Sequence, residues 1–169
     1  MNDTLTRYLG SGTFSERQRA DLLAVLSPIA DRLSCQAHNS AGLEITAGGG
    51  TTAQIGSGVT WQYAVKGISR TIAAGTDMPA LPTGTITADS FNIFCFFADS
   101  AGTVTSAMGT EGTTRALAKF PVFPEGKTLI GYLVVTHSST FTNGTTALDT
   151  ATTVYVSPIG AFDPSVLVA

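Results

Sequence analysis

Apolar residues change their spacing along the chain and divide it into three parts. Residues 1–14 follow neither a helical nor a strand period, so they predict an extended arm. From Ser15 the period becomes helical, and Ser15 with Gln18 has the spacing of a capping box. This predicts one amphipathic helix from Ser15 to Ser34, which Pro28 should kink or split. Its apolar residues are Leu22, Leu23, Val25, Leu26, Ile29, Ala30 and Leu33.

The rest of the chain has the pattern of short strands separated by turn residues, with a sharp break at Gly48-Gly49-Gly50. This regular spacing predicts a mainly β fold, an antiparallel β-sandwich or jelly-roll-like body with an N-terminal arm and one α-helix. We divide the chain into the arm and helix, residues 1–40, and a β-sandwich domain, residues 41–169. The predicted strands are Leu43–Thr46, Val59–Val65, Ile68–Ala73, Thr85–Thr87, Phe91–Ala98, Thr103–Ala107, Leu129–Thr136 and Thr153–Ser157.

Two of these strands are apolar on both faces. Alternation in Phe91–Ala98 places Phe91, Ile93, Cys95 and Phe97 opposite Asn92, Phe94, Phe96 and Ala98. In Leu129–Thr136 it places Leu129, Leu133 and Val135 opposite Ile130, Tyr132 and Val134. One face of an antiparallel sheet is commonly solvated, so we expect a second cover, either the N-terminal helix or another subunit. The sequence therefore predicts a homo-oligomer, a trimer.

Composition narrows the range of partners. Only 12% of the residues are charged, the net charge is -3, and Lys and Arg form no cluster, which argues against nucleic-acid binding. The N-terminus lacks the layout of a signal peptide, and no apolar run approaches a membrane span of ~20 residues, so we expect synthesis in the cytoplasm and no membrane contact. Cys35 and Cys95 share no metal-ligand spacing; Cys95 reads as a buried thiol, and the role of Cys35 stays open.

Candidate chemistry is sparse. A Ser-His-Asp set could be assembled from Ser138, His137 and Asp99 or Asp89, but no nucleophile elbow supports it, and adjacent Ser and His on a strand point to opposite faces. The isolated aspartates resemble turn residues more than metal ligands. We therefore expect no enzyme, no cofactor and no metal. The aromatic residues Trp61, Tyr63, Tyr132 and Tyr155 are either a sugar-stacking platform or packing residues, of which packing is the simpler explanation.

Three β-type segments carry a family resemblance: MPALPTGTITADSFNIFCFFADSAGTVT from Met78, FPVFPEGKTLIGYLVV from Phe120, and FTNGTTALDTATTVYV from Phe141. They resemble segments of tailed-bacteriophage virion proteins, in particular capsid decoration (cement) proteins. The resemblance implies a structural protein on the capsid surface that binds the assembled major capsid protein, often as a trimer. It implies no catalytic residues. A head-fibre or tail-associated host-binding component is the first alternative, and a glycan-active enzyme on a β-scaffold the second.

The arm supplies the candidate partner-binding residues. Leu5, Tyr8, Leu9 and Phe14 have spacings that fit neither helix nor strand, as expected of anchors that enter separate pockets on a partner. A frayed terminus is the alternative explanation.

Overall fold

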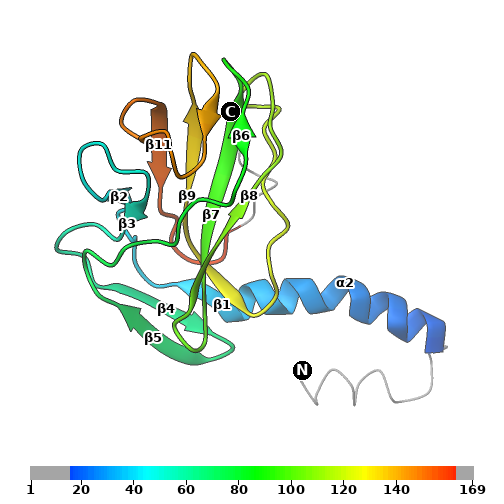
Figure 1. Cartoon of the computed structure of the whole chain (residues 1–169). Coiled ribbons are helices and arrows are strands. Elements are labelled where there is room, and N and C mark those ends of the chain that lie inside the picture. Colours follow the sequence, from blue (N-terminus) through cyan, green and yellow to red (C-terminus); the bar gives the residue numbers. More distant parts are fainter. Residues whose placement is uncertain (1–15, 163–169) are drawn as a thin grey trace.

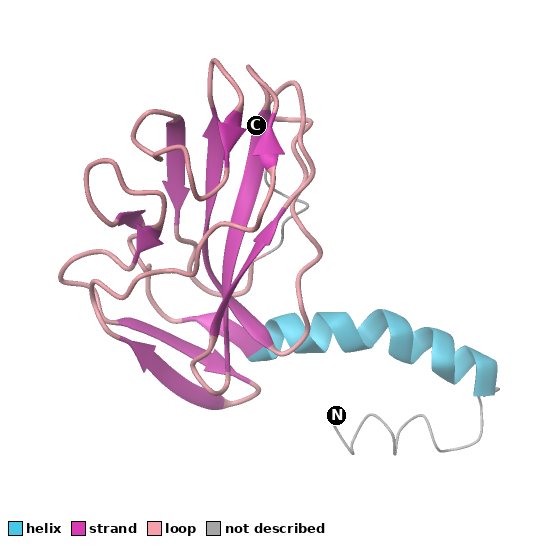
Figure 2. Ribbon diagram, in the orientation of Figure 1, coloured by secondary structure: helices cyan, strands magenta, loops and turns pink. Residues whose placement is uncertain are grey.

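The computed structural model describes residues 16–162, which form one helix and a β-body (Figures 1 and 2). The helix is α2, Glu16–Ser34. The strands are β1 (Cys35–Ala37), β2 (Glu44–Ile45), β3 (Ala53–Gln54), β4 (Trp61–Val65), β5 (Ile68–Ile72), β6 (Thr85–Ile86), β7 (Phe91–Asp99), β8 (Val104–Met108), β9 (Lys127–Thr136), β10 (Phe141–Thr142) and β11 (Thr152–Val156).

The predicted helix is confirmed within one residue at its start, and it is one helix rather than two. Pro28 lies inside α2 without dividing it. A proline at this position removes the hydrogen bond to the carbonyl of Ala24. Ala24 is exposed, so water can satisfy that carbonyl, and the helix continues to Ser34. Glu16 in the first turn and Arg32 in the last complement the helix dipole.

All eight predicted strands are present, with ends that differ by one or two residues. Three short strands were not predicted: β1, β3 and β10. Each has two or three residues, too few to show a period, and each exists through antiparallel pairing with a partner, β1 with β4, β3 with β2, and β10 with β6. Strand β1 follows α2 directly, so the helix enters the body through a sheet strand.

The body is an antiparallel β-sandwich. A four-stranded sheet has the order β11-β9-β7-β8, and a three-stranded sheet has the order β1-β4-β5. The two sheets enclose the larger hydrophobic cluster, to which β4 contributes Trp61 and Tyr63, and β7 contributes Phe94 and Phe96. The rings of Trp61 and Tyr63 stack with centroids 4.4 Å apart. The Thr128 hydroxyl donates to the Ala64 carbonyl at 2.7 Å and joins β9 to β4.

A second hydrophobic cluster covers the outer face of the four-stranded sheet. Ile93, Cys95 and Phe97 of β7 lie in it, as the alternation predicted, with Phe120 and Phe123 from the connection between β8 and β9 packed against them. The expectation that α2 covers this face was therefore wrong, and the homo-oligomer stays a prediction. The connection lacks any strand or helix period, and its aromatic residues form the cover because the chain returns across the sheet before entering β9.

A β-bulge makes the two faces of β9 differ from those that the sequence predicted. The register with β7 shifts between Phe96 and Phe97, so that Phe96 lies opposite Gly131 and Phe97 opposite Leu129. The extra residue exchanges the faces of Leu129 and Ile130: Leu129 packs in the second cluster and Ile130 in the first. The alternation predicted the reverse. At Gly131 a Cβ atom would lie 2.5 Å from the Val156 carbonyl oxygen of β11, so glycine permits this close approach.

Candidate functional site

Helix α2 extends away from the β-body and meets it at its C-terminal end (Figure 1). No residue of α2 is buried. Val25, Ile29 and Leu33 have exposed fractions of 62%, 51% and 60%, and Leu22 and Leu26 are half-buried. We call these five residues, Leu22, Val25, Leu26, Ile29 and Leu33, the α2 stripe. An exposed apolar stripe on a projecting helix is typical of a surface that binds another protein.

The last turn of α2 is fixed to the body by polar contacts. The Gly126 N–H donates to Asp31 Oδ2 at 2.8 Å, and Lys66 Nζ lies 3.9 Å from Asp31 Oδ1. The Lys66 N–H donates to the Ser34 carbonyl at 2.9 Å, which joins the end of the helix to the turn between β4 and β5. The Arg32 guanidinium lies 5.9 Å from the centre of the Phe123 ring. These contacts hold the C-terminal turn, while the remainder of α2 projects.

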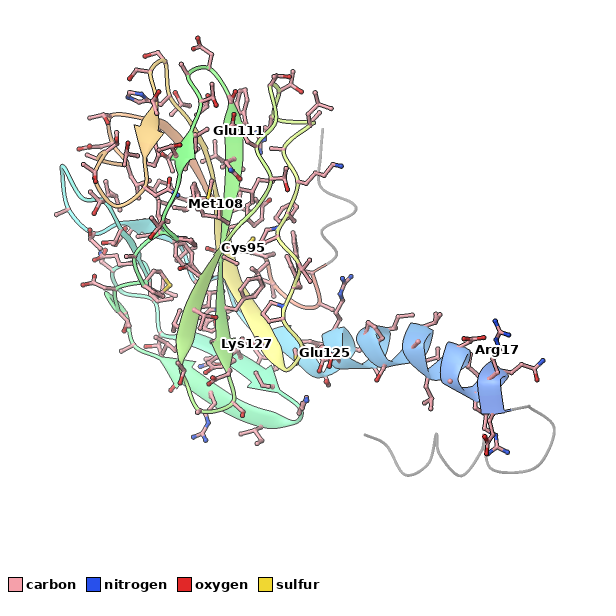
Figure 3. All side chains as sticks on the ribbon, turned by 45° about the vertical axis from the view of Figure 1, so that its right-hand side comes forward. Arg17, Cys95, Met108, Glu111, Glu125 and Lys127 are labelled. Atoms are coloured by element: carbon pink, nitrogen blue, oxygen red, sulfur yellow. The ribbon has the colours of Figure 1, made fainter. Side chains whose placement is uncertain are left out.

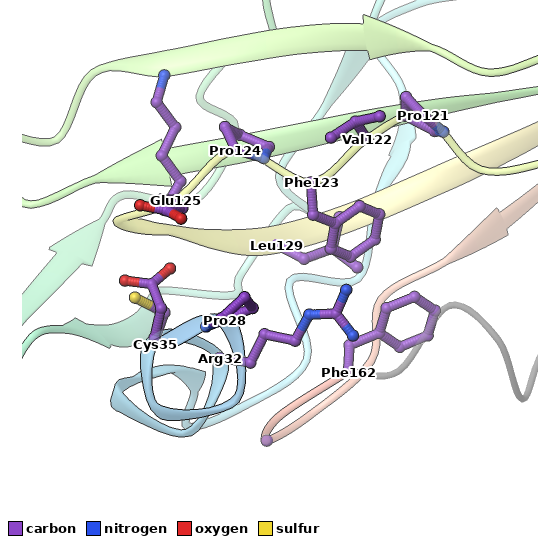
Figure 4. Close-up of a pocket in the computed structure, with 13 residues that line it drawn as sticks. Pro28, Arg32, Cys35, Pro121, Val122, Phe123, Pro124, Glu125, Leu129 and Phe162 are labelled. Atoms are coloured by element: carbon purple, nitrogen blue, oxygen red, sulfur yellow. The ribbon is translucent and has the colours of Figure 1, made fainter. Parts of the chain in front are cut away.

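A pocket of about 660 Å³ lies at this junction (Figure 4). Pro28, Arg32 and Cys35 line it from the helix side, and Phe123 and Phe162 from the body side. Its walls are largely apolar. Burial raises the pKa of the Cys35 thiol, and the nearby Asp31 carboxylate raises it further. The thiol is therefore kept in its protonated form, so Cys35 is a poor nucleophile.

Cys95 is similarly inert. It lies within β7 in the second cluster, and burial raises its pKa far above the usual range for a thiol. Both cysteines are free and buried, as the sequence predicted for Cys95. Neither has the electropositive, partly exposed surroundings that a reactive cysteine requires.

The Ser-His-Asp set that the sequence argued against, Ser138 and His137 with Asp89 or Asp99, is not assembled in the structure. His137 Nδ1 lies 2.9 Å from the hydroxyl of Ser139, and the Ser139 N–H donates to the same nitrogen at 3.2 Å. Asp89 meets His137 through a backbone hydrogen bond, and Asp99 binds the turn after β7. The two-residue spacing of His137 and Ser139 on an exposed turn is a local cap.

The carboxylates of the body hold loops. Glu44 accepts from Gln54 Nε2 and the Ser57 N–H, Asp99 from the N–H groups of Ala101 and Thr103, and Glu111 from the Thr87 N–H. Hydrogen bonds from these groups lower the pKa of each carboxyl. Figure 3 places Glu111 at the end of the body far from α2 and Glu125 beside α2, so these two do not form a carboxylate pair.

The aromatic set that suggested a sugar platform is divided between the two clusters. Trp61 and Tyr63 are fully buried in the first cluster, and Tyr132 packs in the second. Tyr155 is half-buried against the first. These residues act in packing, as the simpler explanation predicted.

Some expectations lie outside what the structure describes. The anchors Leu5, Tyr8, Leu9 and Phe14, and the capping residue Ser15, belong to residues 1–15, which are not described. Within residues 16–162, no group of three or more His, Cys, Asp or Glu side chains is placed to hold a metal ion. The same residues include no helix that is both long and apolar enough to cross a bilayer.

The sequence indicated the apolar face of α2 and offered the helix as one of two possible covers of the sheet, the other being another subunit. It missed the contact of Arg32 with Phe123 and the pocket between them. The run FPVFPEG contained a signal for this pocket wall, since two prolines near a large aromatic residue favour an ordered, non-helical segment.

Comparison of the chain with protein-family models, with curated proteins and with solved structures finds no match.

Proposed function

We propose that this chain is a non-enzymatic structural protein of a bacteriophage particle, a capsid decoration protein that binds the assembled major capsid protein and stabilises the shell. The observation that carries the proposal is the α2 stripe, which projects from a β-body whose central sheet is covered on both faces. A chain of this design keeps its fold in the body and presents a separate apolar surface for assembly.

The chemistry of the body supports the same role. Its two cysteines are buried and protonated, and Glu44, Asp99 and Glu111 are occupied as loop caps. A surface that is mostly neutral and polar limits long-range repulsion between neighbouring copies on a shell. Many weak contacts repeated over such a shell add up to strong attachment.

The direct test is to locate the protein in its source. Mass spectrometry of purified particles should detect it and give a copy number that is a fixed ratio to the major capsid protein. Detection in the soluble fraction of the lysate, with none in the particles, would contradict the proposal.

A reconstitution experiment tests the contribution of α2. Shells that lack the protein are mixed with the intact chain or with the Ile29→Ser/Leu33→Ser variant, and bound copies are counted after sedimentation. We expect the intact chain to saturate the shells and the variant to bind at least about tenfold more weakly, because it loses two apolar side chains that assembly on the shell buries, either against the capsid protein or between neighbouring copies. Ala24→Ser, an exposed change on another face of α2, is the matched control and should bind like the intact chain.

A further inference from the structure

The α2 stripe raises the question of what covers it. A helix of 19 residues is about 28 Å long, and helices in proteins gain most of their stability by packing an apolar face. No residue of α2 is buried against the described body. Within residues 16–162, the apolar face of α2 therefore has no cover.

The spacing of the stripe indicates the kind of partner. Four apolar residues of the stripe are separated by intervals of four, three and four residues: Leu22, Leu26, Ile29 and Leu33. The a and d positions of a coiled coil alternate with these intervals. This order of intervals is the same when read from either end. A second α2 therefore presents a matching set of apolar layers, whichever direction it runs. Val25 flanks this line and widens the apolar face.

The charges of α2 permit such self-association. Glu16, Asp21 and Asp31 balance Arg17, Arg19 and Arg32, so the helix is formally neutral. The residues from Leu22 to Ala30 carry no charge. Two copies can therefore approach along this stretch without like-charge repulsion, whereas an oppositely charged partner would find little to recognise there.

The position of the body also leaves the stripe accessible. Pro28, Arg32 and Cys35 face the pocket and the body. Successive residues of a helix are ~100° apart around its axis. The line through Leu22, Leu26, Ile29 and Leu33 therefore lies roughly a third of a turn from the side of the helix that faces the pocket. Pro28, with its missing backbone hydrogen bond, is thus off the stripe. Most of α2 also extends beyond its own β-body, so that body does not lie over the N-terminal part of the helix (Figure 1).

From these observations we propose that α2 is a self-association helix, in which Leu22, Leu26, Ile29 and Leu33 form a coiled-coil seam with α2 of other copies of this chain. This proposal names a partner for the α2 stripe. It rests on the proposed function in one respect, that α2 serves assembly and not the folding of the body. The intervals place Leu26 and Leu33 at a and Leu22 and Ile29 at d, so every layer of the seam is apolar.

The experiment measures the mass of the purified full chain by light scattering over a concentration series from about 1 to 200 µM. The intact chain should be an oligomer. Leu26→Ser/Ile29→Ser should raise the dissociation constant by about 100-fold or more, since each copy loses two seam contacts. Ala24→Ser should match the intact chain. Fluorescence of the single Trp61, which lies in the body, checks that every variant is folded.

Each outcome decides the proposal. A monomer at every concentration, or an oligomer that the seam variant leaves unchanged, would overturn it. Failure of the capsid role is a separate result: the chain would then be absent from particles while its seam-dependent oligomer persisted in solution. Conversely, a monomeric chain whose seam variant loses shell binding would assign the stripe to the capsid protein and refute self-association.

Discussion

The β-body buries its apolar side chains, whereas α2 exposes several of its own. In the body, large side chains such as Trp61, Phe94 and Leu133 are fully buried, and both faces of the four-stranded sheet are covered. In α2, the residues of similar character at Ile29 and Leu33 are more than half exposed. The same kind of side chain therefore stabilises the fold in one region and remains available for binding in the other.

This difference separates stability from assembly. Changes within the body should alter unfolding, and changes on the α2 stripe should alter association while leaving the body folded. Few contacts couple the two regions, and those at Asp31 and Arg32 lie in the last turn of the helix.

A matched pair of leucine truncations gives the sharpest comparison. Leu133→Ala removes a fully buried side chain in β9 and should lower the free energy of unfolding by about 2–5 kcal/mol. Leu33→Ala, on the stripe, should change it by less than about 0.5 kcal/mol in dilute protein. Urea denaturation followed by Trp61 fluorescence measures both. Equal losses would show that α2 and the body unfold as one unit.

Truncating Phe123, which covers the second cluster, should give the next largest loss of unfolding free energy. The Phe123 ring lies 5.0 Å from Phe97 and 5.9 Å from Phe162, centre to centre. Phe123→Ala should cost about 2–3 kcal/mol of unfolding free energy, less than for a fully buried phenylalanine. Val122→Ala is the neighbouring control, because Val122 is 93% exposed. If a subunit contact stabilised this face instead, the two variants would change association and leave the stability of the dilute chain alone.

The junction between the regions should show a smaller effect. Asp31→Ala removes the acceptor of the Gly126 N–H and should cost about 1–2 kcal/mol. Hydrogen exchange of the Gly126 amide should become faster, because the bond that protects it is lost. Asp21→Ala, an equal charge change on an exposed part of α2, should leave that amide unchanged. Slow exchange in both variants would show that other contacts hold the helix in place.

Acid should weaken the loops of the body. Hydrogen bonds hold the pKa of Glu44, Asp99 and Glu111 below their ordinary values of 4.5, 3.8 and 4.5. A lowered folded pKa means that the stabilisation is present above the ordinary value and is lost as the pH falls through the folded value. The melting temperature should therefore be constant near pH 6–7 and decline below about pH 4. Glu111→Gln should reduce the decline, and a melting temperature that rises on acidification would contradict this account.

The sequence by itself determined the local elements of this protein. Helical spacing predicted the helix, and eight short runs of strand-forming residues bounded by turn residues predicted the strands. The structure has α2 from Glu16 to Ser34 and a strand at each of the eight runs. The sequence also indicated the alternating faces of Phe91–Ala98. These features depend on side-chain direction along a single helix or strand, which neighbouring residues specify.

Tertiary structure decided what each face meets. The bulge opposite Phe96 and Phe97 exchanged Leu129 with Ile130, because an unpaired residue is defined by the partner strand and not by its own sequence. Phe123 packs on the face of the sheet for which α2 was one expected cover, and the sequence did not indicate this because a segment without a period shows no face in advance. The stripe was readable as an apolar helix face, but its exposure depends on where the last turn of α2 attaches to the body, through contacts such as Asp31 with Gly126 that lie 95 residues apart in the chain.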